Sequence, residues 1–289
     1  MTASEDTPSG GFSPAWLDLR AGADARARNR RLEAALAECL PADGIQRIVD
    51  LGAGTGANLR ALASRLGSRQ NWTLLDHDPR LADAARARLA AWAEESRSAG
   101  DDLDLRLRGK TVRVSFVTCD LAQDPAVFAR YAPDLVTASA FFDLVSPDWC
   151  AAFAAALGEC RPLVHAALTC TGAEAWQPPH PADAAVAAAY AAHQRRDKGF
   201  GLAAGPTAPA MLRQALEAAG YRFATAPSPW RLEAPGDDAL MAALAAGTAA
   251  AVAQTGTVSP DALSTWRAAR VGAAQACTIG HADLLAVPR

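Results

Sequence analysis

The sequence predicts an α/β fold, in which a mostly parallel β-sheet carries helices on both faces. Strand-like apolar runs alternate with helical patterns along most of the 289 residues, which is typical of parallel sheets whose strands are joined by crossover helices. Apolar residues make up 51% of the chain, enough for a large buried core. No internal repeat is visible, and we expect residues 41–289 to form a single domain.

Residues 1–40 are expected to precede this domain as a disordered tail and a helical cap. Residues 1–10 are small and polar, a composition typical of disordered termini. A helical pattern then extends from Phe12 to Leu40 and stops before Pro41, because proline cannot continue a helix.

The strands and helices of the domain follow from the same alternation. Proline opens several of the helical segments, where its fixed φ angle suits the first turn. The expected strands are residues 45–51, 72–75, 134–139, 163–168, 221–226 and 278–287. The expected helices are residues 57–66, 79–95, 147–159, 209–219, 237–253 and 260–275.

A β-hairpin insertion is predicted near 103–118. Leucines alternate with polar residues from 103 to 107, and a second alternating run follows the turn signal Gly109-Lys110. Such alternation is the pattern of a half-buried strand. The preceding residues 96–102 are polar and are expected to form a turn.

Two further segments are expected to be inserted into the domain. Residues 170–206 contain four prolines and several glycines around an alanine-rich helix, and are predicted to form a lid. The two helices near 237–275 make a helical insertion before the last strand.

A glycine-rich turn follows the first predicted strand. The apolar run ending at Leu51 leads directly into Gly52-Ala53-Gly54-Thr55-Gly56, and a helical pattern begins at Ala57. Glycine allows a tight turn and lets a ligand approach the backbone closely. Ligands of such sheets bind at the carboxyl ends of the strands. Strand, glycine turn and helix therefore predict a nucleotide-type cofactor site.

Taken alone, this turn is compatible with two cofactor classes. Gly52, Gly54 and Ala57 also fit a dinucleotide motif. Asp76 follows Gly52 by 24 residues, near the spacing of about 20 expected for the acid that binds the ribose of NAD. An NAD-dependent oxidoreductase is therefore an alternative.

Three carboxylates favour the other class. Asp50 lies two residues before the first glycine, Asp76 ends the second predicted strand, and Asp120 ends the strand after it. This ordered set resembles the class I S-adenosylmethionine-dependent methyltransferases, over roughly residues 45–170 and the C-terminal strands. The resemblance implies a Rossmann-like fold whose last strand, here residues 278–287, is antiparallel.

The resemblance also implies roles in binding S-adenosylmethionine. Asp76 would accept hydrogen bonds from both ribose hydroxyls, since one carboxylate can accept both. His77 would pack beside the adenine, Asp120 would meet its exocyclic amine, and the Leu121 backbone would lie near the ring. Ser139 would line the floor near the methyl donor. The residues implied to hold the amino acid end are Asp50, Gly52, Ala53, Gly54 and Gly56. The candidates to close over its carboxylate from the N-terminal cap are Arg20, Arg26 and Arg28.

Residues 139–145 follow the fourth strand of the predicted parallel sheet and are expected to face the substrate. They lack the Asn/Asp-Pro-Pro-Tyr/Phe motif of methyltransferases that act on DNA bases or protein glutamine, and the chain lacks the Pro-Cys nucleophile of RNA cytosine-carbon methylation. Asp143 is a candidate polar contact or general base. Phe142, with Phe141 and Trp149, is expected either to form an apolar substrate wall or to pack in the core.

A polar cluster ends the alanine-rich helix of the predicted lid. Tyr190, His193 and Asp197 share one helical face, and glycines between 199 and 205 allow movement. We expect the lid to cover the substrate and exclude water, with His193 as a candidate general base. The residues expected to contact the substrate here are Tyr190, Arg195, Asp197 and Lys198. The alternative is a helix C-terminus whose basic residues interact with the helix dipole.

Charge and cysteine content bear on partners and compartment. The formal net charge of −3 lacks the basic excess of nucleic-acid-binding proteins. No signal peptide and no apolar run long enough to span a bilayer are visible. The six cysteines form no Cys-x-x-Cys pair, and no residue cluster has metal-ligand spacing. We therefore expect a cytoplasmic enzyme with reduced cysteines and no metal, nucleic-acid or membrane partner.

The expected reaction is direct methyl transfer from S-adenosylmethionine to an oxygen or nitrogen of a small-molecule substrate. Besides the NAD-dependent oxidoreductase, two alternatives stay open. One is a different group transfer from the same cofactor, such as aminopropyl transfer. The other is a non-catalytic methyltransferase-like scaffold that binds a partner.

Overall fold

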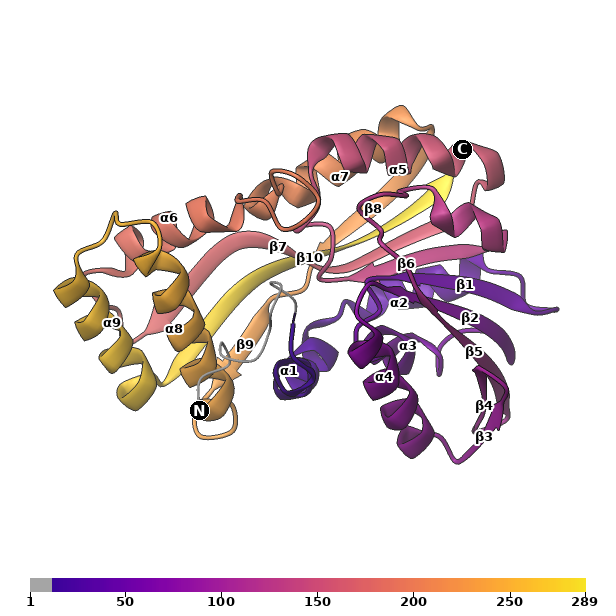
Figure 1. Cartoon of the computed structure of the whole chain (residues 1–289), viewed down its shortest axis with the longest axis horizontal. Helices are drawn as coiled ribbons and strands as arrows, with labels where there is room; N and C mark the ends of the chain where they lie inside the picture. Colours follow the sequence, from indigo (N-terminus) through magenta and orange to yellow (C-terminus); the bar gives the residue numbers. More distant parts are fainter. Residues whose placement is uncertain (1–11) are drawn as a thin grey trace.

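The computed structural model describes residues 12–289, so the disorder expected for residues 1–10 lies outside the described residues. One large sheet carries helices on both faces (Figure 1). Its strands are β1 (Gln46–Leu51), β2 (Arg69–Asp76), β3 (Glu95–Ala99), β4 (Asp102–Leu107), β5 (Lys110–Thr118), β6 (Leu135–Ser139), β7 (Leu163–Gln177), β8 (Tyr221–Pro227), β9 (Trp230–Glu233) and β10 (Ala276–Pro288). The helices are α1 (Pro14–Ala27), α2 (Arg30–Cys39), α3 (Ala57–Leu62), α4 (Pro79–Trp92), α5 (Pro147–Cys160), α6 (Asp183–Gln194), α7 (Ala208–Ala218), α8 (Asp238–Ala253) and α9 (Pro260–Ala273), with 3-10 turns η1 (Val127–Tyr131) and η2 (Gly205–Thr207).

The centre of the sheet is parallel. The strand order is β3-β4-β5-β2-β1-β6-β7-β10-β8, and β9 pairs with β10 outside this order. The strands from β5 to β7 run parallel, whereas β10 is antiparallel to both β7 and β8. The predicted α/β class, the mostly parallel sheet and the antiparallel last strand are therefore confirmed.

Both faces of the sheet are buried. On β1, Ile48 packs with α2, α3 and α4 on one face, whereas Val49 and Leu51 pack with α5 and α7 on the other. Successive side chains of a strand point to opposite faces, so a strand covered by helices on both sides is apolar throughout.

Four helices begin at a Ser-Pro or Asp-Pro pair. In each, the Ser or Asp side chain accepts a hydrogen bond from a backbone N–H of the first turn, and proline occupies the first helical position. Proline costs no hydrogen bond there, because that N–H has no partner within the helix. The pairs are residues 13–14, 78–79, 146–147 and 259–260.

The single helix predicted from Phe12 to Leu40 is wrong, because the chain breaks between α1 and α2. Asn29 caps α2 by accepting a hydrogen bond from the Leu32 N–H at 3.1 Å. The Asn29 N–H is itself directed away from α1, to Asp283 Oδ2 at 2.7 Å. A capping side chain and a distant acceptor therefore outweigh the continuous helical pattern.

Residues 96–102 are not simply the predicted turn, since most of β3 lies within them. This strand pairs antiparallel with β4 at the edge of the sheet. Its residues are almost all exposed, so no apolar alternation marks it in the sequence. The predicted hairpin partner strands β4 and β5 pair through the turn after Leu107.

β7 and β10 continue well beyond the parallel part of the sheet. Residues 170–177, expected within the lid, belong to β7 and pair with residues 276–281 of β10, which also carries β9. We call these paired residues and β9 the sheet extension. Helices α6, α8 and α9 pack beside it around a separate apolar cluster that includes Trp176, Trp230 and Trp266 (Figure 1).

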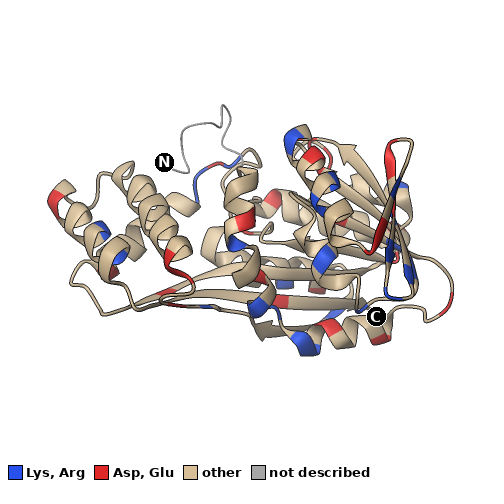
Figure 2. Cartoon of the chain, turned by 90° about the horizontal axis from the view of Figure 1, so that it is seen from below, with Lys and Arg blue, Asp and Glu red and all other residues tan. Residues whose placement is uncertain are grey.

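Acidic and basic residues are intermixed on the hairpin side of the sheet (Figure 2). On β5 and β4, for example, Arg113 pairs with Asp104 at 2.8 Å. Between residues 12 and 289, no helix has both the length and the hydropathy needed to cross a bilayer.

Candidate functional site

A cavity of about 1020 Å³ lies at the carboxyl ends of the parallel strands. The chain order reverses there between β1 and β6, the position at which open α/β sheets bind ligands. Its wall has two parts. The glycine-turn half comprises Gly52, Ala53, Gly54, Asn58, Asp76, His77, Asp120, Leu121 and Ser139. The helical half comprises Arg20, Asp24, Asp143, Cys170, Glu174, Trp176, Tyr190, His193, Lys198, Trp230, Thr248 and His281.

The glycine turn has a backbone that only glycine adopts easily. Gly52, Gly54 and Gly56 have φ angles of +60°, +54° and +72°, in the left-handed region. A Cβ atom at Gly52 would lie 2.7 Å from Phe141 Cδ2. The Ala53 N–H donates to the Leu75 carbonyl at 3.0 Å. The turn is therefore held against β2 with its backbone on the cavity wall.

Asp76 is fixed at the end of β2 by two backbone donors. Its Oδ2 accepts from the Gly54 N–H at 2.8 Å and its Oδ1 from the Asp78 N–H at 3.0 Å. Each carboxylate oxygen can accept more than one hydrogen bond, so Asp76 retains acceptor capacity on the wall. His77 is exposed beside it, with Nδ1 3.5 Å from Asp76 Oδ1.

The ends of the neighbouring strands complete this half. Asp120 is exposed, and its Oδ1 accepts from the Ala122 N–H at 2.9 Å. The Leu121 side chain is buried, and its carbonyl accepts from Trp149 Nε1 at 2.6 Å. Ser139 ends β6, and the next residue, Ala140, has a positive φ of 52°. The two predicted positions after β5 and the one at the end of β6 are thus brought to the same wall.

Two residues predicted to hold the cofactor do not reach the cavity wall. Asp50 is completely buried beneath the turn, where its Oδ1 accepts from Asn58 Nδ2 at 2.7 Å. Burial raises the pKa of Asp50 to about 7. Gly56 forms the N-terminal cap of α3. Asn58, which the sequence analysis missed, lies on the wall in place of Asp50.

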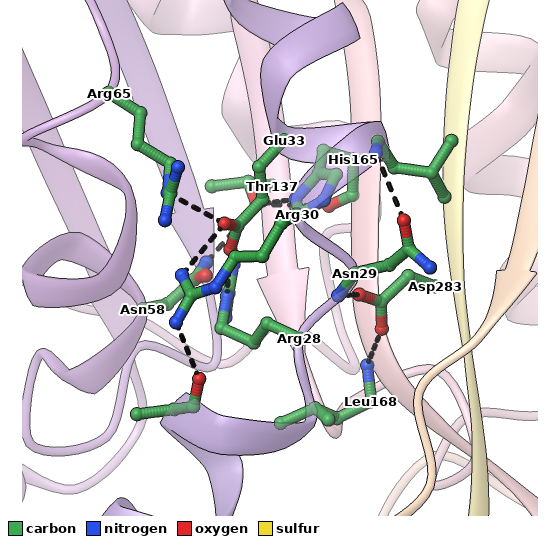
Figure 3. Close-up of polar contacts among 12 residues, drawn as sticks. Arg28, Asn29, Arg30, Glu33, Asn58, Arg65, Thr137, His165, Leu168 and Asp283 are labelled. Atoms are coloured by element: carbon green, nitrogen blue, oxygen red, sulfur yellow. Dashed lines mark hydrogen bonds and ion pairs between the residues drawn. The ribbon is translucent and has the colours of Figure 1, made fainter.

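A buried polar cluster lies behind the glycine turn (Figure 3). Three arginines converge on the fully buried Glu33: Arg28 Nε at 2.6 Å, Arg65 Nε at 2.7 Å and Arg30 Nη1 at 3.0 Å. Arg28 does not line the cavity, because its ion pair with Glu33 holds it within this cluster. The prediction that Arg28 closes over the cofactor is therefore not supported by its position. A buried carboxylate needs such partners to remain charged.

The cluster continues toward β6 and β7. Asn58 Nδ2 also donates to Thr137 Oγ1 at 3.1 Å, and Thr137 Oγ1 lies 3.3 Å from His165 Nδ1. Burial lowers the pKa of His165 to about 3, so this histidine is neutral. It is a core residue whose Nδ1 contacts Thr137, while its buried Nε2 has no hydrogen-bond partner among the described residues.

In the helical half, Asp143 lies on the wall after β6. Its Oδ1 is buried and has no hydrogen-bond partner among the described residues. Burial raises the pKa of this carboxyl. The Asp143 carbonyl accepts from the Gly205 N–H at 2.9 Å, which ties the loop to the segment after α6.

Only some of the residues predicted for the lid line the cavity. Tyr190, His193 and Lys198 line the cavity, whereas Arg195 and Asp197 do not. The helical face predicted for them ends early, because α6 stops at Gln194. Asp197 Oδ1 instead accepts from the N–H groups of residues 199 and 201, at 2.7 and 3.1 Å. Arg195 is exposed and lies against Gly205.

Of the two readings for Phe142, core packing is the one observed. Phe142 is buried behind the wall, with its ring 5.6 Å from those of Phe141 and Phe153. Phe141 is the residue on the wall, and its ring packs edge to face with Phe200 and Trp149. Both rings are buried and pack against each other, but only Phe141 lines the cavity.

Several wall residues were not among the predicted substrate contacts. Arg20 pairs with Asp24 along α1, with Nε 3.0 Å from Oδ2, and its guanidinium lies 4.9 Å from the Trp230 ring centre. Glu174 and His281 belong to the sheet extension. Arg20 was one of three arginine candidates, Glu174 fell within the predicted lid and His281 within the predicted last strand, whereas β9 carried no signal. Arg26 lies away from the wall, paired with Asp237 at 2.6 Å.

Among residues 12–289, no group of His, Cys, Asp and Glu side chains is arranged to hold a metal ion. All six cysteines are free, and burial raises the pKa of the Cys170 thiol on the wall.

No protein-family model and no curated protein matches this chain. Among solved structures, it is similar to a cyclopropane-fatty-acyl-phospholipid synthase-like protein from Lactobacillus casei, with 16% identity, 92% of this chain and 98% of that chain covered, and a TM-score of 0.51. A SAM-dependent methyltransferase from Thiobacillus denitrificans, in complex with S-adenosyl-L-homocysteine, is 16% identical over 96% of this chain and 99% of its own, with a TM-score of 0.43. With its strand order, the chain has the Rossmann-like fold of the class I methyltransferases.

Proposed function

We propose that this protein is an S-adenosylmethionine-dependent methyltransferase that methylates an oxygen or nitrogen of a small molecule. The cofactor would occupy the glycine-turn half and the acceptor the helical half. The observation that carries the proposal is Asp76. Two backbone N–H groups fix its carboxylate at 2.8 and 3.0 Å, next to left-handed glycines, and it can accept further hydrogen bonds from the hydroxyls of a ribose.

The other residues of this half have the matching chemistry. Asp120 has one oxygen engaged by a backbone N–H and one left to accept from an adenine amine. The backbone of Gly52 and Gly54 leaves room for an amino acid moiety, and Asn58 offers an amide. When bound, the cofactor supplies a methyl group activated by a sulfonium. A small-molecule acceptor is favoured because α1, α6 and α8 all contribute to the cavity wall.

The main task of the protein in such a transfer is to align the acceptor with the methyl group. Alignment of this kind can contribute about 7–11 kcal/mol to lowering a barrier. Walls built on strand ends and packed helices suit that task, because they hold the acceptor with little freedom. With both ligands bound, the same walls would exclude water from the reacting atoms.

Two residues of the cavity wall, His193 and Asp143, are the candidates to accept a proton from the acceptor atom. His193 Nε2 lies 3.1 Å from Gln254 Oε1, and because an amide oxygen only accepts, Nε2 carries the proton and Nδ1 is the basic atom. Burial lowers the pKa of His193, which keeps the ring neutral near pH 7. The raised pKa of Asp143 makes it a stronger base than an exposed carboxylate.

An NAD-dependent oxidoreductase fits less well, because Asp120 and the antiparallel β10 have no required role in it. A non-catalytic scaffold would not need the glycine turn and strand-end carboxylates that line the wall. We further propose a cytoplasmic location, supported by the six free cysteines.

Cofactor binding is tested by calorimetry and thermal shift with S-adenosylhomocysteine and with NAD. We expect S-adenosylhomocysteine alone to bind and to raise the melting temperature, since a ligand stabilises the state that binds it. Stabilisation by NAD alone would overturn the proposal.

Asp76→Ala tests the residue that carries the assignment. Loss of two hydrogen bonds to a charged acceptor should weaken S-adenosylhomocysteine binding by at least about 100-fold. The matched control is Asp134→Ala, which removes a carboxylate at the opposite end of the sheet, paired with Arg47 at 2.9 Å. The control should bind normally, and normal binding by Asp76→Ala would remove Asp76 from the site.

A further inference from the structure

The helical half of the cavity has a chemical character of its own. Resting on the proposed methyl transfer, we infer that the acceptor substrate is an amine, a molecule with a protonated nitrogen and an apolar body, whose ammonium group is recognised by the carboxylates of Asp143 and Glu174. Three features of the wall point to this class: the balance of charge, an unpartnered buried oxygen, and the apolar surfaces around them.

The charge balance of this half is negative. Arg20, the one arginine of the described wall, makes two hydrogen bonds to Asp24, at 3.0 and 3.1 Å, so these two charges neutralise each other. Neither Asp143 nor Glu174 takes part in an ion pair among residues 12–289. Lys198 is exposed at the rim. The charge of Arg20 also acts on Asp143, where it favours the ionised carboxyl and opposes the larger effect of burial on the pKa. Two carboxyl groups without an ion-pair partner among the described residues thus face the cavity.

Among residues 12–289, no cationic side chain near Glu174 forms an ion pair with it. Trp176 Nε1 donates to Glu174 Oε1, which is a neutral donor. The nearby guanidinium of Arg270 is buried and bound to Asp183 and to the Pro178 carbonyl. A second carboxyl group on the cavity wall therefore has no ion-pair partner of its own among the described residues.

Of the two carboxyl groups, Asp143 gives the stronger support for an ammonium ligand. A carboxylate oxygen that is buried without a hydrogen bond costs free energy, and Asp143 Oδ1 is such an atom. The residue is held in place, since its carbonyl accepts from the Gly205 N–H at 2.9 Å. An ammonium group carries up to three N–H donors and a positive charge, and would satisfy this oxygen with a strong, charge-assisted hydrogen bond.

The rest of the wall suits an apolar body. Phe141, Phe200 and Tyr190 contribute aromatic surface, and α8 contributes the small or aliphatic residues Leu244, Gly247, Thr248 and Ala251. Two of the three tryptophan rings on the wall already face guanidinium groups, Trp230 that of Arg20 and Trp176 that of Arg270, and the third, Trp16, adds apolar surface. Recognition of the cation is therefore assigned to the carboxylates, and that of the body to the apolar side chains.

A substrate with a carboxylate would meet the wrong charges here. It would lie against Asp143 and Glu174, with Arg20 already committed to Asp24 and Lys198 available only at the rim. A neutral alcohol would leave both carboxylates without a counter-charge. The three classes can therefore be separated by binding.

The test uses the full chain saturated with S-adenosylhomocysteine and three sets of matched probes. Each set contains an amine, an alcohol and a carboxylic acid on one skeleton: 2-phenylethylamine, 2-phenylethanol and 3-phenylpropionate, then the corresponding indole and hexyl compounds. Binding is measured by saturation-transfer NMR and titration. We expect the amines to bind at least about tenfold more tightly than their alcohol and acid counterparts. Equal or tighter binding of alcohols or acids, or no binding by any amine, would overturn the inference.

Two isosteric variants identify the site. Asp143→Asn and Glu174→Gln should each weaken amine binding by about tenfold, while the affinity for S-adenosylhomocysteine changes by less than about twofold. Glu217→Gln on the exposed face of α7 makes the same change of charge away from the cavity and should leave both unchanged. Unaltered amine binding in both cavity variants contradicts the inference. Failure of the wild-type chain to bind S-adenosylhomocysteine is a different result, and contradicts the proposed function instead.

Discussion

The two halves of the cavity are built in different ways. The glycine-turn half consists largely of backbone, supplied by one short segment and by the ends of adjacent strands. The helical half consists of side chains that come from α1, α6, α8, the loop after β6 and the sheet extension. The first half is ordered by the sheet itself, through hydrogen bonds such as Gly54 N–H to Asp76 Oδ2 at 2.8 Å. The second is ordered by packing between elements far apart in the sequence.

This difference separates two kinds of specificity. Backbone groups and strand-end carboxylates can recognise a ligand that never changes, such as a cofactor. Side chains on separately packed helices can be exchanged without altering the sheet. Substitutions in one half should therefore affect cofactor binding, and substitutions in the other should affect the acceptor.

The largest effect is expected for Gly52→Ala. The left-handed φ of +60° and the 2.7 Å approach of a new Cβ to Phe141 would force the turn to move, at a cost of about 1–3 kcal/mol in stability. We expect S-adenosylhomocysteine binding to fall by more than about 100-fold, since the turn is the wall of the site. Calorimetry and urea unfolding measure the two effects.

Gly158→Ala is the control for this change. Gly158 lies in α5, and a Cβ there would meet nothing within 4 Å, so alanine should stabilise the helix by up to about 1 kcal/mol. Normal cofactor affinity in Gly52→Ala would show that the turn is not the cofactor site and would remove the contrast between the halves.

His193→Ala should separate binding from turnover. General bases contribute about 100-fold or more to a rate, so methylation of the identified substrate should fall by about that factor while cofactor affinity is preserved. Arg195→Ala, two positions after His193, removes an exposed residue that does not line the cavity and should leave turnover intact. Equal turnover in both variants would assign His193 a structural role, through its contact with Gln254.

The smallest effect on binding is expected for Asp50→Asn, because Asp50 lies behind the turn. Its consequence is in stability. The pKa of Asp50 is raised from 3.8 to about 7 in the folded chain, so over that pH range the native state binds more protons than the unfolded state. Stability of the wild type should fall as pH rises through this range, at most by about 1.4 kcal/mol per pH unit, relative to Asp50→Asn.

Chemical denaturation of both proteins at several pH values checks this prediction. A constant difference in unfolding free energy across the range would show that Asp50 titrates normally. A large loss of cofactor affinity in Asp50→Asn would place Asp50 in the binding site, contrary to its burial beneath Asn58.

The contrast between the halves also explains what the sequence could predict. The glycine turn is contiguous, and Asp76 and Asp120 follow apolar runs, so their meeting at one sheet edge follows from the parallel order of the strands. The Ser-Pro and Asp-Pro helix starts are equally local signals. These features depend on residues close together in the chain, where pattern and structure coincide.

The helical half depends on long-range contacts that no local pattern reports. The break at Asn29 requires Asp283, which lies 254 residues later. Glu174 was expected in a lid, because the prolines after it obscured the length of β7. Trp230 belongs to β9, whose alternation of apolar and polar residues covers only four positions and is too brief to distinguish a strand from a loop. In each case tertiary pairing outweighed local preference.

The long arms of β7 and β10 have an evolutionary consequence. They carry part of the helical half of the cavity wall on a piece of sheet that lies outside the parallel frame, so insertions or exchanges among α6, α8 and α9 leave the register of β1, β2 and β6 untouched. Related proteins with this arrangement could acquire new substrates by changes in the sheet extension and its helices, while the glycine-turn half stays the same. We therefore expect the sequence of the glycine turn to change slowly in evolution and that of the sheet extension to change faster.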